Sequence, residues 1–488
     1  WDKIVVHNPL PYRRREVVEI AVAFPRNWGE QTGFQYVDAL WHGERYNKFH
    51  LVDFEGNRIA YQLRNIVRGL EVHRLDEFGR RMMQSGDYYH LAVELDLPAC
   101  GSLSLQVEGT CDGTRNFGTL RTAPLRAENE HLTFELAADG TGTLTDKGSG
   151  LTFSGLFQYE DAGDGGDGWC RGPLVDDIRY VSPGASVMTA IEEDGPLRTV
   201  FRVERRFFLP REMNRHTWSR TEDRETLRVT DFIAIEKHAR TLKVRTEVAN
   251  FVRDHRLRVL FPTSRRAANS FADTPFAAVE RSIHIPGETA LWQERVNEEK
   301  AFTSWCGVAD ADGGLALLSP WGLHEYAVLD DDDRTLAVTL FRSFFKTVFQ
   351  AAETEGEIQQ SLTFEYQLLP FAGDFAPVEA GRLVAAAQAR VRVHTTHQLA
   401  PQISRMAIEG AVLLTALKLA DDGDGVILRL WNPAPKPATA RLQMGTPPRE
   451  VLETNLREDP GDLIQGAEGA MITVVVPASG LYTIRCRW

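Results

Sequence analysis

Apolar and polar residues alternate along most of the chain, and this pattern predicts β-strands. The segments 132–136, 197–203 and 242–248 each place mostly apolar side chains at every second position. Successive side chains of a strand point to opposite faces, so the pattern fits sheets with one buried and one wet face. Turn residues such as Asp139-Gly140 and Lys147-Gly148 separate the predicted strands. The sequence therefore predicts a mainly β protein.

Helical periodicity is rare. The candidate helices are Asp76–Met83 and Glu379–Val393, and the second is rich in alanine but short of large apolar residues. Such a segment forms a helix readily but has little to bury, so we expect it to connect domains rather than to contribute to a core. Without crossover helices, strands pair antiparallel, and antiparallel sheets pack as sandwiches.

Three blocks are predicted along the chain. Residues 1–115 are expected to form a small β-sandwich, 125–375 a large central sandwich domain, and 376–488 a linker helix followed by a C-terminal β domain. A length of 488 residues allows about three domains with a large buried core.

Composition narrows the classes of function. The chain carries 55 Lys and Arg against 68 Asp and Glu, a net charge of −13, which argues against a nucleic-acid partner. No apolar run is long enough for a membrane helix, and the opening residues lack the layout of a signal peptide. The five cysteines are scattered, without a C-x-x-C pair, so we expect no disulfide framework and a bacterial cytoplasmic location.

Motifs for metal binding or nucleophilic catalysis are missing from the sequence. None of the thirteen histidines belongs to an H-x-D, H-x-H, H-E-x-x-H or His-His-Asp pattern. There is no G-x-S-x-G or P-loop motif either, and no G-x-G-x-x-G that opens a helix. We therefore assign no catalytic residue and no metal ligand in this chain.

One acidic, glycine-rich segment has the composition of a sugar-binding loop. Residues 161–167 read Asp-Ala-Gly-Asp-Gly-Gly-Asp and lead through Gly168 into Trp169. Carboxylates accept hydrogen bonds from hydroxyl groups, and an aromatic face packs against a sugar ring. The acidic run Asp330–Asp333 lies between two predicted strands and is interpreted as a solvated turn.

Several separated segments resemble the C-terminal half of glycoside hydrolase family 38, the retaining α-mannosidases. In chain order they are His7–Arg13, Asp161–Trp169, His255–Pro262, Phe271–Arg281, Trp305–Asp310, Gly314–Leu318, Gly322–Tyr326 and Leu336–Arg342. The resemblance implies multi-domain antiparallel β-sandwiches with a central supersandwich like that of galactose mutarotase.

In that family, an N-terminal catalytic domain supplies a zinc ion, an aspartate nucleophile and an acid/base carboxylate. The motifs for these groups are absent here, so the resemblance implies that zinc belongs to an N-terminal domain missing from this chain. It further implies that the chain braces this domain, lines one wall of a site for mannose-containing glycans, and is inactive alone. Exposed sandwich edges leave the oligomeric state open.

Three residues are the expected sugar contacts. By resemblance, an aromatic residue after the acidic loop maps onto Trp169, where the family commonly has Tyr, and a late-strand arginine maps onto Arg342. Asp167 stands in the loop just before the tryptophan. The planar guanidinium of Arg342 could clamp sugar hydroxyls, or it could pair with a neighbouring carboxylate at a sheet edge.

Two other functions stay open from the sequence. A mutarotase-like sugar-modifying enzyme would need a histidine and a carboxylate on one concave face. The candidates are His284, His324, Glu280 and Glu325. A stand-alone carbohydrate-binding protein would use exposed aromatic residues, for which the candidates are Trp169, Trp305 and Trp321.

Overall fold

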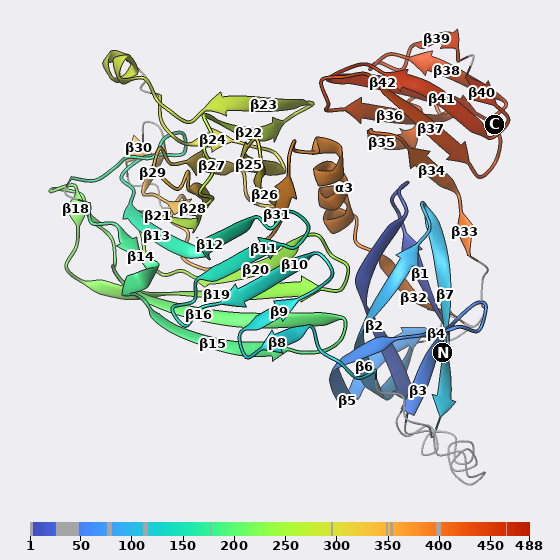
Figure 1. Cartoon of the computed structure of the whole chain (residues 1–488), viewed down its shortest axis with the longest axis horizontal. Coiled ribbons are helices and arrows are strands. Elements are labelled where there is room, and N and C mark those ends of the chain that lie inside the picture. Colours follow the sequence, from blue (N-terminus) through green and yellow to red (C-terminus); the bar gives the residue numbers. More distant parts are fainter. Residues whose placement is uncertain are drawn as a thin grey trace.

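A computed structural model gives the fold of the chain. It describes every residue outside 1–2, 26–47, 76–80, 111–115, 176, 294–295, 348–349, 352–354, 397–401 and 465. The described part consists of antiparallel sheets, as the alternating pattern predicts. Figure 1 shows the blue N-terminal strands and the red C-terminal strands on one side of the large central part, with one helix between them.

Two sheets face each other in the N-terminal sandwich. One has the order β32-β1-β7-β3-β4, with β33 also paired to β7, and the other is β2-β6-β5. Their inward side chains share one buried cluster, which includes Val6, Leu51 and Leu91. The strands are β1 (Lys3–Asn8), β2 (Arg14–Pro25), β3 (Lys48–Asp53), β4 (Arg58–Ile59), β5 (Tyr61–Leu75), β6 (Arg81–Leu97), β7 (Gly101–Thr110), β32 (Arg392–Thr396) and β33 (Ile403–Ser404).

A nine-stranded sheet forms one layer of the central part. Its order is β15-β16-β19-β20-β31-β26-β25-β22-β23. The strands are β15 (Ser186–Glu193), β16 (Arg198–Pro210), β19 (Arg224–Glu236), β20 (Leu242–Ala249), β31 (Ser361–Ala372), β26 (Gly313–Trp321), β25 (Trp305–Asp310), β22 (Asn269–Thr274) and β23 (Ala277–Ser282).

Two further sheets lie against the nine-stranded one and complete the supersandwich. Their orders are β14-β13-β21-β28-β27-β24 and β12-β11-β10-β9-β8, and β12 contacts β21. The strands are β14 (Tyr180–Val181), β13 (Gln158–Gly163), β21 (His255–Phe261), β28 (Leu336–Ser343), β27 (Glu325–Val328), β24 (Lys300–Ala301), β12 (Thr152–Leu156), β11 (Gly142–Asp146), β10 (Leu132–Leu136), β9 (Arg126–Glu128) and β8 (Arg121–Ala123).

Two short hairpins and two 3₁₀ helices also belong to this central part. They are the hairpins β17 (Met213–Asn214) with β18 (Ser219–Arg220) and β29 (Lys346–Thr347) with β30 (Gln350–Ala351), and the 3₁₀ helices η1 (Ser182–Gly184) and η2 (Gly287–Leu291).

The core of the central part contains a buried ion pair among aromatic rings. Phe134, Phe157 and Phe201 pack together from three different segments. Within this core, Arg205 and Asp231 have no exposed side-chain surface and form an ion pair. Asp231 also accepts hydrogen bonds from the hydroxyl groups of Tyr159, at 2.6 Å, and Thr246, at 2.7 Å. These extra donors offset the cost of desolvating the pair.

The C-terminal domain is a second, smaller sandwich. Its sheets have the orders β34-β37-β41-β40 and β35-β36-β42-β38-β39, and one apolar cluster fills the space between them. The strands are β34 (Met406–Glu409), β37 (Ala438–Met444), β41 (Met471–Val476), β40 (Ala467–Glu468), β35 (Leu413–Leu419), β36 (Val426–Asn432), β42 (Gly480–Arg487), β38 (Glu450–Thr454) and β39 (Pro460–Leu463).

The helix predictions need two corrections. Of the segment Asp76–Met83, residues 76–80 lie outside the described part, and residues 81–83 belong to β6, where pairing with β5 satisfies their backbone groups. The other helix, α3, spans Pro377–Gln388, and the chain continues into β32. Contrary to the expectation of a mere connector, α3 buries Ala380 and Val384 against β26 and β31. Small side chains let it approach the sheet closely.

No helix in the described ranges is both long and apolar enough to span a bilayer.

Candidate functional site

The acidic segment forms a tight loop at the end of β13, and Asp164 holds it closed. This side chain is fully buried, and its Oδ1 accepts the backbone N–H groups of Gly166, at 2.9 Å, and Gly172, at 3.0 Å. The loop folds back on itself, because the N–H of Gly165 donates to the carbonyl of Gly172 and that of Asp167 to the carbonyl of Cys170. We call residues 164–172 the acidic loop.

Arg342 at the end of β28 fastens the acidic loop to the sheet. Its Nε donates to Asp164 Oδ2 at 2.7 Å, and its Nη2 donates to the carbonyl oxygens of Asp167, at 2.9 Å, and Cys170, at 2.8 Å. A guanidinium offers this fork of donors in fixed directions. The pairing with a neighbouring carboxylate that the sequence left open is therefore present. Of the three guanidinium nitrogens of Arg342, Nη1 alone makes no hydrogen bond to the described residues.

Asp167 and Trp169 lie at the outer tip of the acidic loop. Asp167 Oδ1 accepts the N–H of Cys170, at 3.0 Å, and that of Trp169, at 2.9 Å, and these hydrogen bonds hold the pKa of Asp167 below its usual value. No hydrogen bond involves its Oδ2 in the described part of the chain. The indole of Trp169 is 75% exposed, so its ring faces are free for contact. The structure thus places Asp167 and Trp169 on the acidic loop, with Arg342 of β28 bonded to that loop.

Two glycines are required where the arms of the acidic loop cross. A Cβ at Gly166 would lie 2.0 Å from the carbonyl oxygen of Cys170, and one at Gly172 would lie 2.5 Å from the nitrogen of Gly166. Both neighbours are backbone atoms, which cannot turn away. The glycine content of the segment therefore reflects close packing of the loop.

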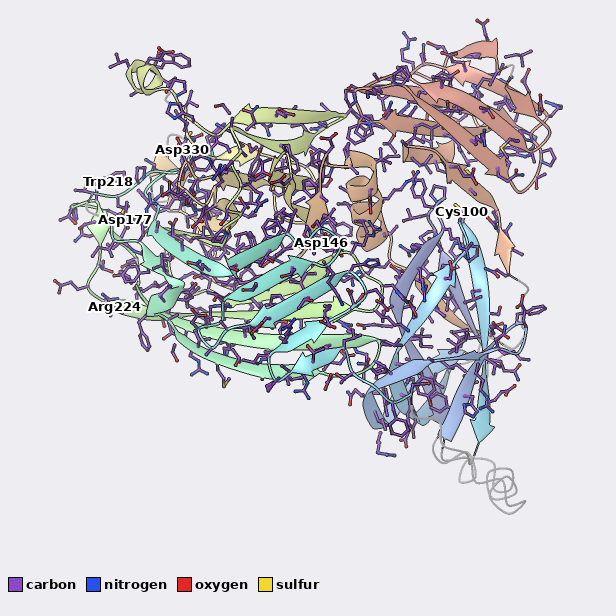
Figure 2. The ribbon with its side chains drawn as sticks, in the orientation of Figure 1. Cys100, Asp146, Asp177, Trp218, Arg224 and Asp330 are labelled. Carbon is purple, nitrogen blue, oxygen red and sulfur yellow. The ribbon has the colours of Figure 1, made fainter. Side chains whose placement is uncertain are left out.

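The loop packs on a hairpin at one end of the central sandwich. Trp218, between β17 and β18, accepts the N–H of Val175 with its carbonyl oxygen, and its ring lies beside Gly165. Asp177 accepts the N–H of Gly163 at 2.9 Å. Figure 2 shows Asp177 and Trp218 at this end of the molecule, away from the N- and C-terminal domains.

A buried polar network beneath the loop was missed by sequence reasoning. Asp161 Oδ2 lies 2.5 Å from His255 Nδ1, its Oδ1 accepts a hydrogen bond from Arg220, and His255 Nε2 lies 3.1 Å from Asn250 Oδ1. Burial opposes ionisation of Asp161, but the charges of Arg220 and His255 lower its pKa below the usual value. Asp161 stands in the predicted acidic segment, yet its partners are distant in sequence.

The other sequence candidates do not form a second centre. Glu280 lies on β23 and Glu325 on β27, which belong to different sheets. Glu325 accepts the hydroxyl of Thr339, and the exposed His284 pairs with Asp330. His324 lies near Phe302, at a ring distance of 6.5 Å. In the described part of the chain, neither His284 nor His324 makes a hydrogen bond to Glu280 or Glu325.

The tryptophan candidates differ in exposure. Trp305 is 1% exposed, within the cluster that α3 covers, and cannot contact a sugar. Trp321 is 51% exposed at the end of β26. Of the three tryptophans, Trp169 alone stands beside acceptor groups of the acidic loop.

Comparison with models of protein families shows to which family this chain belongs. Residues 127–347 match the model described as glycosyl hydrolases family 38 C-terminal domain. Residues 411–477 match the glycosyl hydrolases family 38 C-terminal beta sandwich domain. The chain belongs to glycosyl hydrolase family 38. The resemblance seen in the separated sequence motifs is thus confirmed, and the acidic loop and Arg342 both lie within the first matched region of this family 38 chain.

A curated relative and two solved structures resemble this family 38 chain. The relative, from Halalkalibacterium halodurans, is named "Putative mannosylglycerate hydrolase" and is 28% identical over 332 residues, which cover 63% of this chain and 36% of the relative. An alpha-mannosidase from Enterococcus faecalis V583 matches with a TM-score of 0.84 and 21% identity, over 99% of this chain and 56% of its own.

The second structure is a family 38 protein from Enterococcus faecalis, with a TM-score of 0.82 and 20% identity, over 99% of this chain and 58% of its own. At these identities the solved structures show the fold, which is the mainly β sandwich architecture predicted from the sequence. The chain spans about a third of the curated relative and little more than half of each solved chain.

Proposed function

We propose that this chain is the C-terminal β region of a retaining, zinc-dependent family 38 α-mannosidase, where it braces a catalytic domain and lines one wall of the sugar site. The acidic loop carries the proposal, because it presents an exposed indole and free acceptor atoms from a rigid base. The partial coverage of longer relatives supports the view that the reaction centre lies in another part of the protein.

Trp169, Asp167 and Arg342 each have a role in this proposal. The Trp169 ring stacks on a face of the sugar, and Asp167 accepts a hydroxyl hydrogen with its unused Oδ2. Arg342 donates hydrogen bonds to the loop from Nε and Nη2, so its main role is to position Asp167 and Trp169. Its Nη1 remains available to contact a sugar oxygen. Binding groups held rigidly cost less entropy when the sugar arrives.

The chemistry of hydrolysis falls to the catalytic domain. Retaining hydrolysis uses two carboxylates about 5 Å apart, one as nucleophile and one as acid and base. Among the described residues, no three His, Cys, Asp or Glu side chains are grouped as a metal site requires, so they do not fit zinc. We therefore assign the metal to the catalytic domain. We expect this chain by itself to have no hydrolase activity.

The substrate class follows from the relative's name. We propose an α-mannoside, with mannosylglycerate as the first compound to test. Such a substrate would sit with its mannose ring against Trp169. The partner of this chain is then the catalytic domain of the same polypeptide, in a cytoplasmic bacterial enzyme.

A sugar titration tests the wall of the site. The chain is titrated with mannose and with mannosylglycerate by calorimetry and by ¹⁹F NMR of fluorotryptophan. We expect weak binding that shifts the Trp169 resonance and is abolished by Trp169→Ala. The matched control is Trp292→Ala, since Trp292 is also exposed, at 57%, outside the loop. Binding that survives Trp169→Ala would refute the assignment of this loop.

A stand-alone carbohydrate-binding protein is the second candidate, favoured by the same exposed indole. It predicts tight glycan binding by this chain alone, whereas a wall of a larger site binds weakly without its other half. The titration above distinguishes the two by the dissociation constant.

A further inference from the structure

The buried carboxylate of Asp254 and the half-buried carboxylate of Glu357 meet directly beneath the acidic loop. Asp254 is 1% exposed, and its backbone has a φ of 47°, in the left-handed region that non-glycine residues avoid. Its carbonyl oxygen accepts the N–H of Asp164 at 2.8 Å, which anchors the first residue of the acidic loop. Its Oδ2 accepts the N–H of Met213 at 3.1 Å. Asp254 therefore ties the loop to the hairpin of β17 and β18.

Glu357 reaches the same place from the segment that precedes β31, where it contacts the end of the strand that bears Arg342. Its Oε2 accepts the hydroxyl of Ser343 at 3.0 Å, and the Ser343 oxygen accepts the N–H of Ile358 at 3.1 Å. Ser343 follows Arg342 on β28 and pairs with His255, the neighbour of Asp254. The register of the strands thus brings the two acids together although they are distant in sequence.

Each acid leaves one buried oxygen without a donor. Asp254 Oδ1 and Glu357 Oε1 find no hydrogen-bond donor in the described part of the chain. Glu357 lies close enough to act on Asp254 through its charge and through a side-chain hydrogen bond. Such unsatisfied buried acceptors are costly, and two adjacent carboxylates cannot both ionise cheaply. A single proton between the two oxygens satisfies both of them.

The cations of this region are engaged elsewhere. Arg220 and His255 pair with Asp161, Arg342 pairs with Asp164, and Arg253 pairs with Glu212. Arg215, whose guanidinium lies over the ring of Phe345, supplies an opposing charge that acts on Asp254. Burial and the negative charge of Glu357 outweigh it and raise the pKa of Asp254 from 3.8 to about 7.

We propose that Asp254 and Glu357 share one proton, and that this hydrogen bond between carboxyl and carboxylate positions the acidic loop. Its loss above neutral pH places two negative charges in one buried site and loosens the contact with Asp164. The raised pKa makes the stabilising contribution complete below about pH 4 and lost as the pH rises through about 7. The inference concerns the loop itself and stands whether or not the loop binds a sugar.

Amide hydrogen exchange on the whole chain tests this pair. Protection factors of the Asp164 and Gly165 amides are measured from pH 6 to pH 8.5, corrected for intrinsic exchange. We expect protection to fall on the order of tenfold over this range. Asp254→Asn and Glu357→Gln each replace the shared proton with an amide N–H that does not titrate, so protection in either variant is expected to stay level.

The controls separate the pair from other titrating groups. Glu212→Gln removes a nearby carboxylate that does not touch the pair, and it is expected to keep the fall with pH. If Asp254→Asn does not fold, Glu357→Gln and ¹³C NMR titration of the carboxyl groups in the unmodified chain give the same answer. Level protection in the unmodified chain, or a fall that persists in both amide variants, overturns the proposal. Removal of the fall by added Ca²⁺ or Mg²⁺ would show cation binding instead and overturn it too.

Discussion

Replacing Asp164 by alanine should release the acidic loop while leaving the central sandwich folded. The carboxylate accepts two hydrogen bonds from Arg342 and one each from the backbone of Gly166 and Gly172. Arg342 is 11% exposed and Asp164 fully buried at their side chains. Removing one partner from a buried ion pair costs about 3–5 kcal/mol, because the remaining charge is left uncompensated.

This cost should appear as local opening. The loop lies at the surface, so Arg342 and the freed N–H groups reach water once it opens, and the rest of the core is spared. A loss of about 3 kcal/mol raises the population of the open loop by more than about 100-fold. The amides of Gly165 and Asp167, which donate within the loop, report this opening by hydrogen exchange.

Matched variants separate charge from hydrogen bonding. Asp164→Asn keeps an acceptor oxygen for the two glycine N–H groups but loses the negative charge, so its effect should be intermediate. The double variant of Asp164→Ala with Arg342→Ala should cost less than the sum of the single variants. Unchanged protection of Gly165 and Asp167 in Asp164→Ala would refute the view that this carboxylate closes the loop.

Four further results are expected. Asp231→Ala should lower the free energy of unfolding by about 3–5 kcal/mol in urea titrations, and a loss under about 1 kcal/mol would contradict the role of the buried pair. Asp161 has a lowered pKa, so its stabilisation is present at neutral pH and is lost as the pH falls below 3.8; Asp161→Asn should flatten that acid limb of the pH–stability curve. Gly166→Ala should open the loop as Asp164→Ala does, measured by the same exchange experiment, and a fully protected loop would be inconsistent with the crossing described. Trp169→Ala should change thermal stability by no more than about 0.5 kcal/mol, because the ring is exposed, and a larger loss would show that it packs against the protein.

The sheets could be predicted because their pattern is local. In β20, every second residue from Leu242 to Val248 falls on the buried face, and all of these except Thr246 are apolar. The helix Asp76–Met83 failed at residues 81–83 because pairing with β5 overrides a weak local preference. The predicted end of the second helix at Val393 was wrong because the strand β32 pairs with β1 through residues that include Val393. Both errors arise from strands that are distant in sequence.

The candidate site divides in the same way. Composition alone points to the acidic segment and to Trp169, since glycine, aspartate and tryptophan stand together. The sequence does not tell which of Asp161, Asp164 and Asp167 is buried, because that depends on partners such as Arg342, 178 residues beyond Asp164. The contact of Asp254 with Glu357 depends likewise on strand register. The loop could therefore be located from the sequence. The residues that hold it in place are distant in sequence and could be identified only from the folded structure.

The central claim is that this chain forms the wall of an α-mannosidase site whose reaction centre lies in another domain. The most direct measurement is an assay of hydrolysis. The protein encoded by the complete reading frame that contains this sequence and the 488-residue chain are each tested on mannosylglycerate and on an aryl α-mannoside. The account predicts activity in the longer protein, none in this chain, and a raised KM when the longer protein carries Trp169→Ala. Hydrolysis by this chain alone, or a complete protein without activity on any α-mannoside, would contradict it.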